Sequence, residues 1–255
     1  MALNLLRRAE REDAIKVKIE KNKLKIIALW EKIISRKISP DQPKRFTDLI
    51  PQMNGIRRSP NPDSIGIVGE FYSLKLFRNV LFESGMEKKI LCYLDSLDDV
   101  IWFQEQPTRI NYYKKDGEKK SYYPDIAVLD RKNQALVIEV KPLYNMFLFE
   151  TLSKSLAAIR ILNSKGISFV IVDGGGNSIC DLAKVSVDHE IEREILNLVD
   201  NRVVNWAIYR NEIKGALSMR QLGSIVVRNN LSYSHWPFRL SRITSPNIGF
   251  DCFLK

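Results

Sequence analysis

Residues 122–141 read YYPDIAVLDRKNQALVIEVK, and this stretch decides the fold. It holds two nearly continuous apolar runs, within residues 122–129 and 135–140, separated by a short polar segment. Short apolar runs bounded by turn residues are typical of strands in a sheet, and an unbroken run indicates burial on both faces. We therefore expect two successive strands at the centre of the protein.

The flanking sequence predicts an α/β core with a mixed sheet. Asp116-Gly117 is a hairpin signal between two β-like runs. The order helix, antiparallel strands, helix, strand is that of an α/β core. The expected helices are residues 80–97 and 152–163, and the other expected strands are residues 100–106, 109–113 and 167–172.

Three parts of the chain differ in character. Residues 1–62 combine an amphipathic basic helix, over about residues 8–37, with a Pro-rich connector, and residues 63–175 hold the α/β core. Residues 176–255 follow a triple glycine that marks a turn or linker, and they contain an expected helix at 187–199. Residues 218–240 predict a helix, an Asn-Asn turn and a second helix, which is a helix-turn-helix pattern. Two helices that only pack together or dock a protein fit this pattern equally well.

The net charge of +10 is unevenly distributed. Residues 1–60 have 15 Lys+Arg against 7 Asp+Glu, residues 61–175 have 15 against 15, and residues 176–255 have 10 against 8. A basic arm suits a polyanion, because each neutralised phosphate releases condensed counterions; a solvated helix explains the same charge. If the arm binds nucleic acid, the expected contacts are Arg7, Arg8, Lys16, Lys23, Lys44, Arg45, Arg57 and Arg58.

Composition excludes several classes of protein. Three cysteines without a CxxC spacing and only two histidines exclude a zinc framework and a His-rich nuclease. No apolar run approaches the roughly 18 residues of a membrane span, and Arg7 and Arg8 interrupt the apolar N-terminus before it could form a signal peptide. We therefore expect a cytoplasmic protein without membrane contact, whose chemistry comes from carboxylates and lysines.

Charged residues interrupt the central strands at their ends. Asp125 follows a proline at the head of one strand, and Glu139 and Lys141 end the next, on the same face because strand side chains alternate. Glu87 lies on the apolar face of the preceding helix. Such charges are costly to bury unless they are paired or bound to metal.

Converging carboxylates make a hard oxygen site suited to Mg²⁺ or Mn²⁺, with one or two ions. Asp125, Glu139 and the Val140 carbonyl are the expected ligands, Glu87 is the third carboxylate, and Lys141 orients or deprotonates the attacking water. Taken singly, these residues are better explained as a strand-end ion pair, a turn aspartate and a solvated helix acid.

Taken in order, the residues resemble a known nuclease pattern. Pro124-Asp125 and Glu139-Val140-Lys141, with thirteen residues between the two acids, match the PD-(D/E)xK nucleases, which implies a restriction-endonuclease-like core. Ser84-x-x-Glu87 and Gln106-Pro107 narrow the resemblance to the TnsA-type transposon endonucleases over about residues 66–174.

The TnsA resemblance implies further features. Gln106 lies at the edge of the site, and Glu87 rather than the nearby Glu83 is the helix acid. The resemblance also implies a winged-helix-like C-terminal domain, double-stranded DNA as substrate, a DDE-type transposase subunit and an AAA+ ATPase regulator as partners, and association with the bacterial nucleoid when assembled. Two other readings remain open: a stand-alone nuclease in restriction, phage defence or repair, and a catalytically silent DNA-binding or assembly protein.

Overall fold

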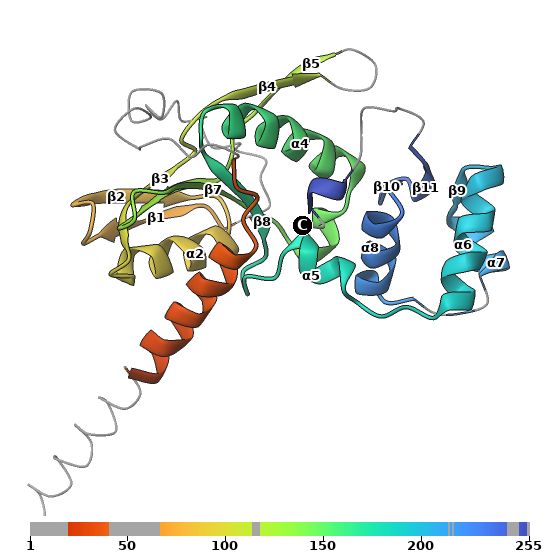
Figure 1. The fold of residues 1–255 in the computed structure, drawn as a ribbon, viewed down its shortest axis with the longest axis horizontal. Helices are drawn as coiled ribbons and strands as arrows, with labels where there is room; N and C mark the ends of the chain where they lie inside the picture. The colour runs from red at the N-terminus through yellow and green to blue at the C-terminus, as the bar shows by residue number, and fades with distance from the viewer. Residues whose placement is uncertain are drawn as a thin grey trace, which may run out of the picture.

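The computed structural model describes most of the chain, namely residues 20–40, 67–113, 118–213, 215, 217–243 and 250–253. Figure 1 shows its helices and strands. The central sheet has four strands in the order β3-β6-β7-β8, with β3, β6 and β7 antiparallel and β7 and β8 parallel. The predicted mixed sheet is therefore confirmed. Its strands are β3 (Val100–Glu105), β6 (Ile126–Asp130), β7 (Ala135–Val140) and β8 (Ser168–Val172).

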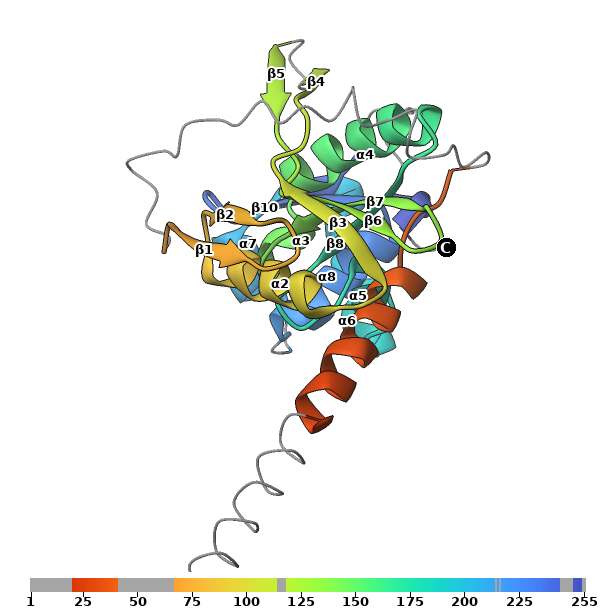
Figure 2. The same ribbon diagram turned by 90° about the vertical axis from the view of Figure 1, so that its left-hand side faces the viewer.

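Helices cover both faces of this sheet, as Figure 2 shows with α4 on one side and α2 on the other. The α4 face packs on one apolar cluster, and the α2 face packs on a second cluster that includes Trp30 and Ile33 from a helix over residues 20–35. Alternate residues of β7 divide between the two clusters, as a strand buried on both faces requires. The helices are α2 (Gly85–Ser96), the short α3 (Leu143–Met146) and α4 (Phe149–Ser164).

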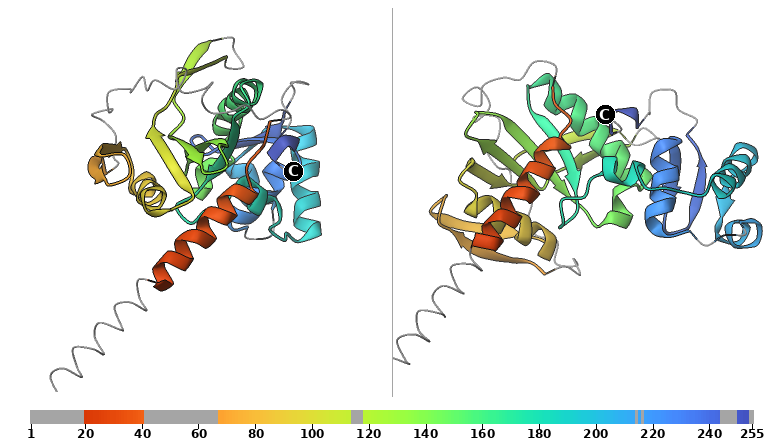
Figure 3. Two further views of the ribbon diagram at one scale, coloured as in Figure 1. Left: turned by 60° about the vertical axis from the view of Figure 1, so that its left-hand side comes forward. Right: turned by 60° about the horizontal axis from the view of Figure 1, so that its bottom comes forward.

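The N-terminal segment is built into this core (Figure 3). Trp30 is 6% and Ile33 is 2% exposed. Ile38 then pairs with the outer strand β8, since its N–H donates to the Phe169 carbonyl at 2.7 Å and its carbonyl accepts from Phe169 at 3.0 Å. This bridge covers part of the outer edge of the sheet, where unpaired backbone groups would otherwise be open to another chain. The predicted helix is confirmed over the residues described, and its first half lies outside them.

Two hairpins flank the sheet. The first, β1 (Gly69–Ser73) with β2 (Arg78–Phe82), was not predicted, and the helix expected from residue 80 begins instead at Gly85 behind the N-cap Ser84. Cross-strand pairing accounts for the error, because it holds residues 80–82 in a strand. The second, β4 (Ile110–Tyr113) with β5 (Lys119–Tyr122), confirms the predicted hairpin, although its turn lies outside the described residues.

The C-terminal part packs on the α4 side of the core and shares its apolar cluster. It contains three helices of seven residues or more and a three-stranded sheet in the order β10-β11-β9. Its elements are α5 (Ile179–Ala183), α6 (His189–Asn201), β9 (Val204–Asn205), α7 (Trp206–Glu212), α8 (Met219–Arg228), β10 (Leu231–Ser234), β11 (Arg239–Arg242) and a 3-10 turn η3 (Asp251–Phe253).

The predicted helix-turn-helix is wrong in its second half. The first helix is α8, but β10 and β11 form an antiparallel hairpin where the second helix was expected. Leu231 and Tyr233 are buried and alternate with the partly exposed Ser232 and Ser234, which is the period of a strand. Among the residues described, no helix has the length and apolar character required to cross a bilayer.

The contact of α8 with the core can be tested at Gly223. A Cβ atom there would lie 2.8 Å from Cδ1 of the Phe147 ring. Overpacking at this contact costs about 1–3 kcal/mol, and the higher helix propensity of alanine offsets about 1 kcal/mol of that cost. We therefore expect Gly223→Ala to lower the free energy of unfolding. Gly85→Ala is the control, since nothing lies within 4 Å of its added Cβ. Urea unfolding that ranks Gly223→Ala at or above the wild type would contradict this packing.

Candidate active site

The register of β6 and β7 brings two acids together. Ile126 pairs with Ile138, so Asp125 and Glu139, the next residues outward, lie opposite each other. The Val140 N–H donates to Oδ2 of Asp125 at 2.7 Å and fixes that carboxylate against β7. A motif split by thirteen residues in the sequence is therefore one contact in space, made by two strands.

The ammonium of Lys141 lies where the predicted metal ligands converge. Its Nζ is 3.2 Å from Asp125 Oδ2, 2.8 Å from Glu139 Oε1 and 3.2 Å from the Val140 carbonyl. Lys141 and Glu139 share one face of the chain, as the strand period predicts. Three oxygen atoms thus surround one positive charge, and the ammonium is the cation that this oxygen cluster holds in the structure.

Glu139 is enclosed by groups that the sequence analysis did not identify. Its side chain is fully buried, Tyr122 donates its hydroxyl hydrogen to Oε2, and Nζ of Lys154 on α4 is 3.3 Å from Oε1. The Lys154 ammonium also lies 4.9 Å from the centre of the Tyr122 ring. Helical spacing could have identified Lys154, because it is three residues after Thr151 and four before Ala158, both buried against the sheet.

Glu87 and Gln106 line the same cavity, which has a volume of about 320 Å³, together with Asp125, Glu139 and Lys141. The Glu87 carboxylate is directed to its own helix start, where it accepts hydrogen bonds from the Glu83 N–H at 2.8 Å and the Ser84 hydroxyl at 3.0 Å. Gln106 donates from Nε2 to Glu83 Oε1 at 2.8 Å.

The structure therefore gathers the five predicted catalytic residues around one cavity, with Glu83 beside them. It does not draw Glu87 into contact with the other two acids. Within the described ranges, no three His, Cys, Asp or Glu side chains form a ready metal-binding group. Asp125, Glu139 and the Val140 carbonyl instead converge on the Lys141 ammonium.

Burial and charge set opposite pKa shifts at the two central acids. Burial, then the nearby charge of Glu139, raises the pKa of Asp125 to about 7, although Lys141 opposes the shift. Burial also acts to raise the pKa of Glu139, but Lys141 and Lys154 outweigh it and lower that pKa. Burial acts to lower the pKa of Lys141, yet Asp125 and Glu139 raise it above its ordinary value. Burial raises the pKa of Glu87. The carboxylates that line the cavity therefore outnumber its two lysines, Lys141 and Lys154.

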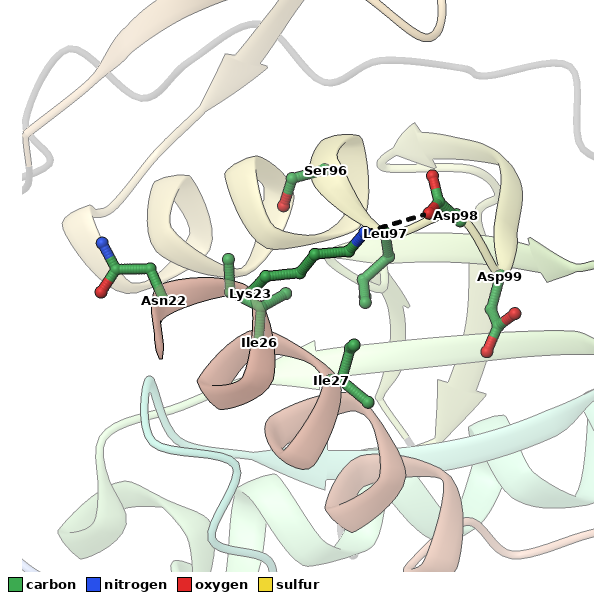
Figure 4. A pocket seen from close by; sticks show the side chains of 8 residues that line it. All are labelled: Asn22, Lys23, Ile26, Ile27, Ser96, Leu97, Asp98 and Asp99. Atoms are coloured by element: carbon green, nitrogen blue, oxygen red, sulfur yellow. Dashed lines mark ion pairs between the residues drawn. The ribbon is translucent and has the colours of Figure 1, made fainter. Parts of the chain in front are cut away.

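Of the eight predicted nucleic-acid contacts, only Lys23 lies among the described residues. Its Nζ is 3.8 Å from Asp98 Oδ2, across a groove that Asp99, Ile26 and Ile27 also line (Figure 4). The predicted contacts outside the described residues are Arg7, Arg8, Lys16, Lys44, Arg45, Arg57 and Arg58.

Asp125 predicts a pH-dependent stability. Asp125 holds its proton more tightly in the folded protein than in the unfolded chain, where the pKa of aspartate is near 3.9. The free energy of unfolding therefore falls as pH rises from about 4 to about 7. We expect Asp125→Asn to exceed the wild type in melting temperature at pH 8 in EDTA, with the difference shrinking towards pH 5. The exposed Asp99→Asn is the control. A constant difference between Asp125→Asn and wild type at all pH values would contradict the burial of this charge.

Tyr122 predicts a local stability effect. Tyr122→Phe removes the hydroxyl that donates to the buried Glu139 carboxylate. It should lower the free energy of unfolding by about 1.5–3 kcal/mol, the contribution of a hydrogen bond to a charged group. Tyr123→Phe, at the neighbouring residue that lines the same cavity, should change the free energy of unfolding by less than about 0.5 kcal/mol. Equal effects of the two substitutions in urea unfolding would argue against the contact with Glu139.

Comparison with known proteins agrees with this geometry. Residues 97–174 match the family model described as TnsA-like endonuclease N terminal. The match runs from β3 to the turn after β8 and includes Asp125, Glu139 and Lys141, whereas Glu87 precedes it. No curated protein matches the chain. The resemblance inferred from the motifs is confirmed over this segment, since residues 97–174 match the model of a TnsA-like endonuclease N-terminal domain.

Proposed function

We propose that the protein is a metal-dependent DNA endonuclease subunit of a heteromeric transposase, hydrolysing phosphodiester bonds at transposon ends together with a DDE-type transposase subunit. The observation that carries the proposal is the convergence of Asp125, Glu139 and the Val140 carbonyl on one cation inside a TnsA-like endonuclease domain. The family match supports nuclease chemistry, and the oxygen cluster supports its dependence on a metal.

The residues fit a hard divalent ion. Carboxylate and carbonyl oxygens are the donors that Mg²⁺ and Mn²⁺ prefer, and Asp125, Glu139 and Val140 would supply them. When bound, one or two such ions would polarise the scissile phosphate and lower the pKa of a coordinated water. Because Lys141 now lies among these oxygens, the ammonium must leave that position when a divalent ion enters.

Lys141 has a clear role once it is displaced. In the arrangement described, Asp125 and Glu139 raise the pKa of Lys141 and favour the charged ammonium. Displaced into the cavity, it would orient the attacking water and offset the charge that develops on phosphorus. Lys154, on the same oxygen of Glu139, would remain to hold that carboxylate in place. Gln106 and Glu87 would border the phosphate.

The fold of the C-terminal part supports the proposal that the protein is a subunit of a larger complex. Its elements follow the order helix, strand, helix, helix and two-stranded hairpin, with β9 added to the hairpin sheet. This order is consistent with a winged-helix-like domain. By resemblance, such a domain would help join the protein to DNA and to an AAA+ ATPase regulator.

Cleavage tests the proposal. Purified protein with Mg²⁺ or Mn²⁺, alone and with a DDE-type subunit encoded beside it, should nick supercoiled plasmid, and EDTA should abolish the activity. Asp125→Ala and Lys141→Ala should bind DNA but lower the nicking rate at least a hundredfold, because each removes a group at the reacting phosphate. Asp99→Ala and Lys165→Ala remove the same charges elsewhere in the domain and should cut normally. Full cleavage by both site variants, or none by the wild type and its complex, would contradict the proposal.

A further inference from the structure

The face of α8 that a helix-turn-helix protein would offer to DNA is enclosed. Six successive residues, 222–227, are buried, and Figure 3 shows α8 between the core and the outer helices. The Ser224 hydroxyl donates to the carbonyls of Ala183 at 3.3 Å and Val185 at 3.0 Å, and Gly223 abuts Phe147. Any nucleic acid bound by the C-terminal part must therefore meet another surface.

The opposite side of the C-terminal part carries an aromatic ridge. The helix α7 has no buried residue, and its Trp206 is 53% exposed. The Trp206 ring lies 5.6 Å from the Tyr209 ring and 5.3 Å from the Phe238 ring. At the tip of the β10–β11 hairpin, Trp236 is 87% exposed and lies 5.2 Å from the His235 ring. Figure 1 places α7 at the outer edge of the molecule.

Positive charge is concentrated on the same elements. Residues 202–242 contain seven Lys+Arg and a single acid, Glu212. Ion pairs occupy three of these arginines: Arg202 pairs with Glu212, Arg228 with Glu192 and Arg242 with Asp200.

Two arginines beside the ridge have no such partner. Arg210 and Arg239 are exposed, and neither forms an ion pair with any residue that the structure describes. The register pairs the backbone of Arg239 with Asn205, the residue before Trp206, and Arg210 is one helical turn after Trp206, so both arginines lie on elements that carry the ridge.

We propose that Trp206, Arg210, Trp236 and Arg239 form a surface that binds the duplex DNA flanking the cleavage site. Guanidinium groups pair with phosphates, and exposed aromatic rings beside them can pack on the sugars of the DNA backbone. Duplex DNA fits this surface better than a protein does, because the unpaired charge is of one sign and is carried by arginine. The proposal rests on the proposed DNA substrate and assigns the flanking contact to a surface away from the active-site cavity.

Binding of a labelled 40-base-pair duplex, measured by fluorescence anisotropy in EDTA, tests the surface without cleavage. Arg210→Ala/Arg239→Ala should weaken binding about tenfold or more, and should reduce the slope of log affinity against log salt by about 1.8, for two lost phosphate contacts. Trp236→Ala, at a side chain almost wholly in solvent, should weaken binding severalfold and leave that slope unchanged.

Arg228→Ala/Arg242→Ala is the matched control, because it removes two positive charges from arginines already paired with acids. It should leave the salt slope at the wild-type value. If the Arg210/Arg239 variant binds as the wild type does, or if both double variants weaken binding equally, the proposed surface is wrong while the cleavage proposal stands. A wild type that neither binds nor cuts DNA overturns both proposals.

Discussion

The ammonium of Lys141 lies among oxygens of Asp125, Glu139 and Val140, and the charge balance of the buried site depends on this contact. Without the lysine, two buried carboxylates would face each other at the meeting point of β6 and β7. Removing one partner of such a cluster is strongly destabilising, because it leaves an uncompensated buried charge. Lys154 and Tyr122 enclose Glu139 further. The same oxygens are of the kind that a divalent ion prefers, so the proposed metal site coincides with the position that the Lys141 ammonium occupies in the structure.

In the described part of the N-terminal segment, residues 20–40, several basic side chains bond to the rest of the protein. Lys32 donates to Asn177 at 2.6 Å, and Arg36 pairs with Asp181 at 2.8 Å, so basic residues of this segment join it to the turn and helix after β8. Trp30 and Ile38 add an apolar contact and a strand-edge contact. The described end of the arm is thus structural. In the C-terminal part, acidic side chains of α6 form ion pairs with arginines of neighbouring elements. The net charge of this part is therefore small, although its outer surface is basic.

The sequence predicts the central sheet well, because apolar runs and the Asp-Gly turn are local signals that burial reinforces. The positions of Asp125, Glu139 and Lys141 follow from strand period and register. The sequence does not predict the β1–β2 hairpin, because its residues form strands only where they pair with each other. The β10–β11 hairpin was expected to be a helix although Leu231 and Tyr233 alternate with serines, which is the period of a strand. Helical spacing places Lys154 on the face of α4 that packs on the sheet, but its contact with Glu139 crosses the helix–sheet interface and follows only from the tertiary fold.

Anomalous diffraction from crystals grown with Mn²⁺ would test the central claim most directly, since it locates both the ion and the lysine. The account predicts a manganese peak coordinated by Asp125, Glu139 and the Val140 carbonyl, at about the 2.0–2.2 Å typical of small octahedral divalent ions. It also predicts that the Lys141 ammonium has moved out of contact with these oxygens, while Lys154 still contacts Glu139. A peak bound elsewhere, or Lys141 unmoved beside an occupied site, would contradict the account.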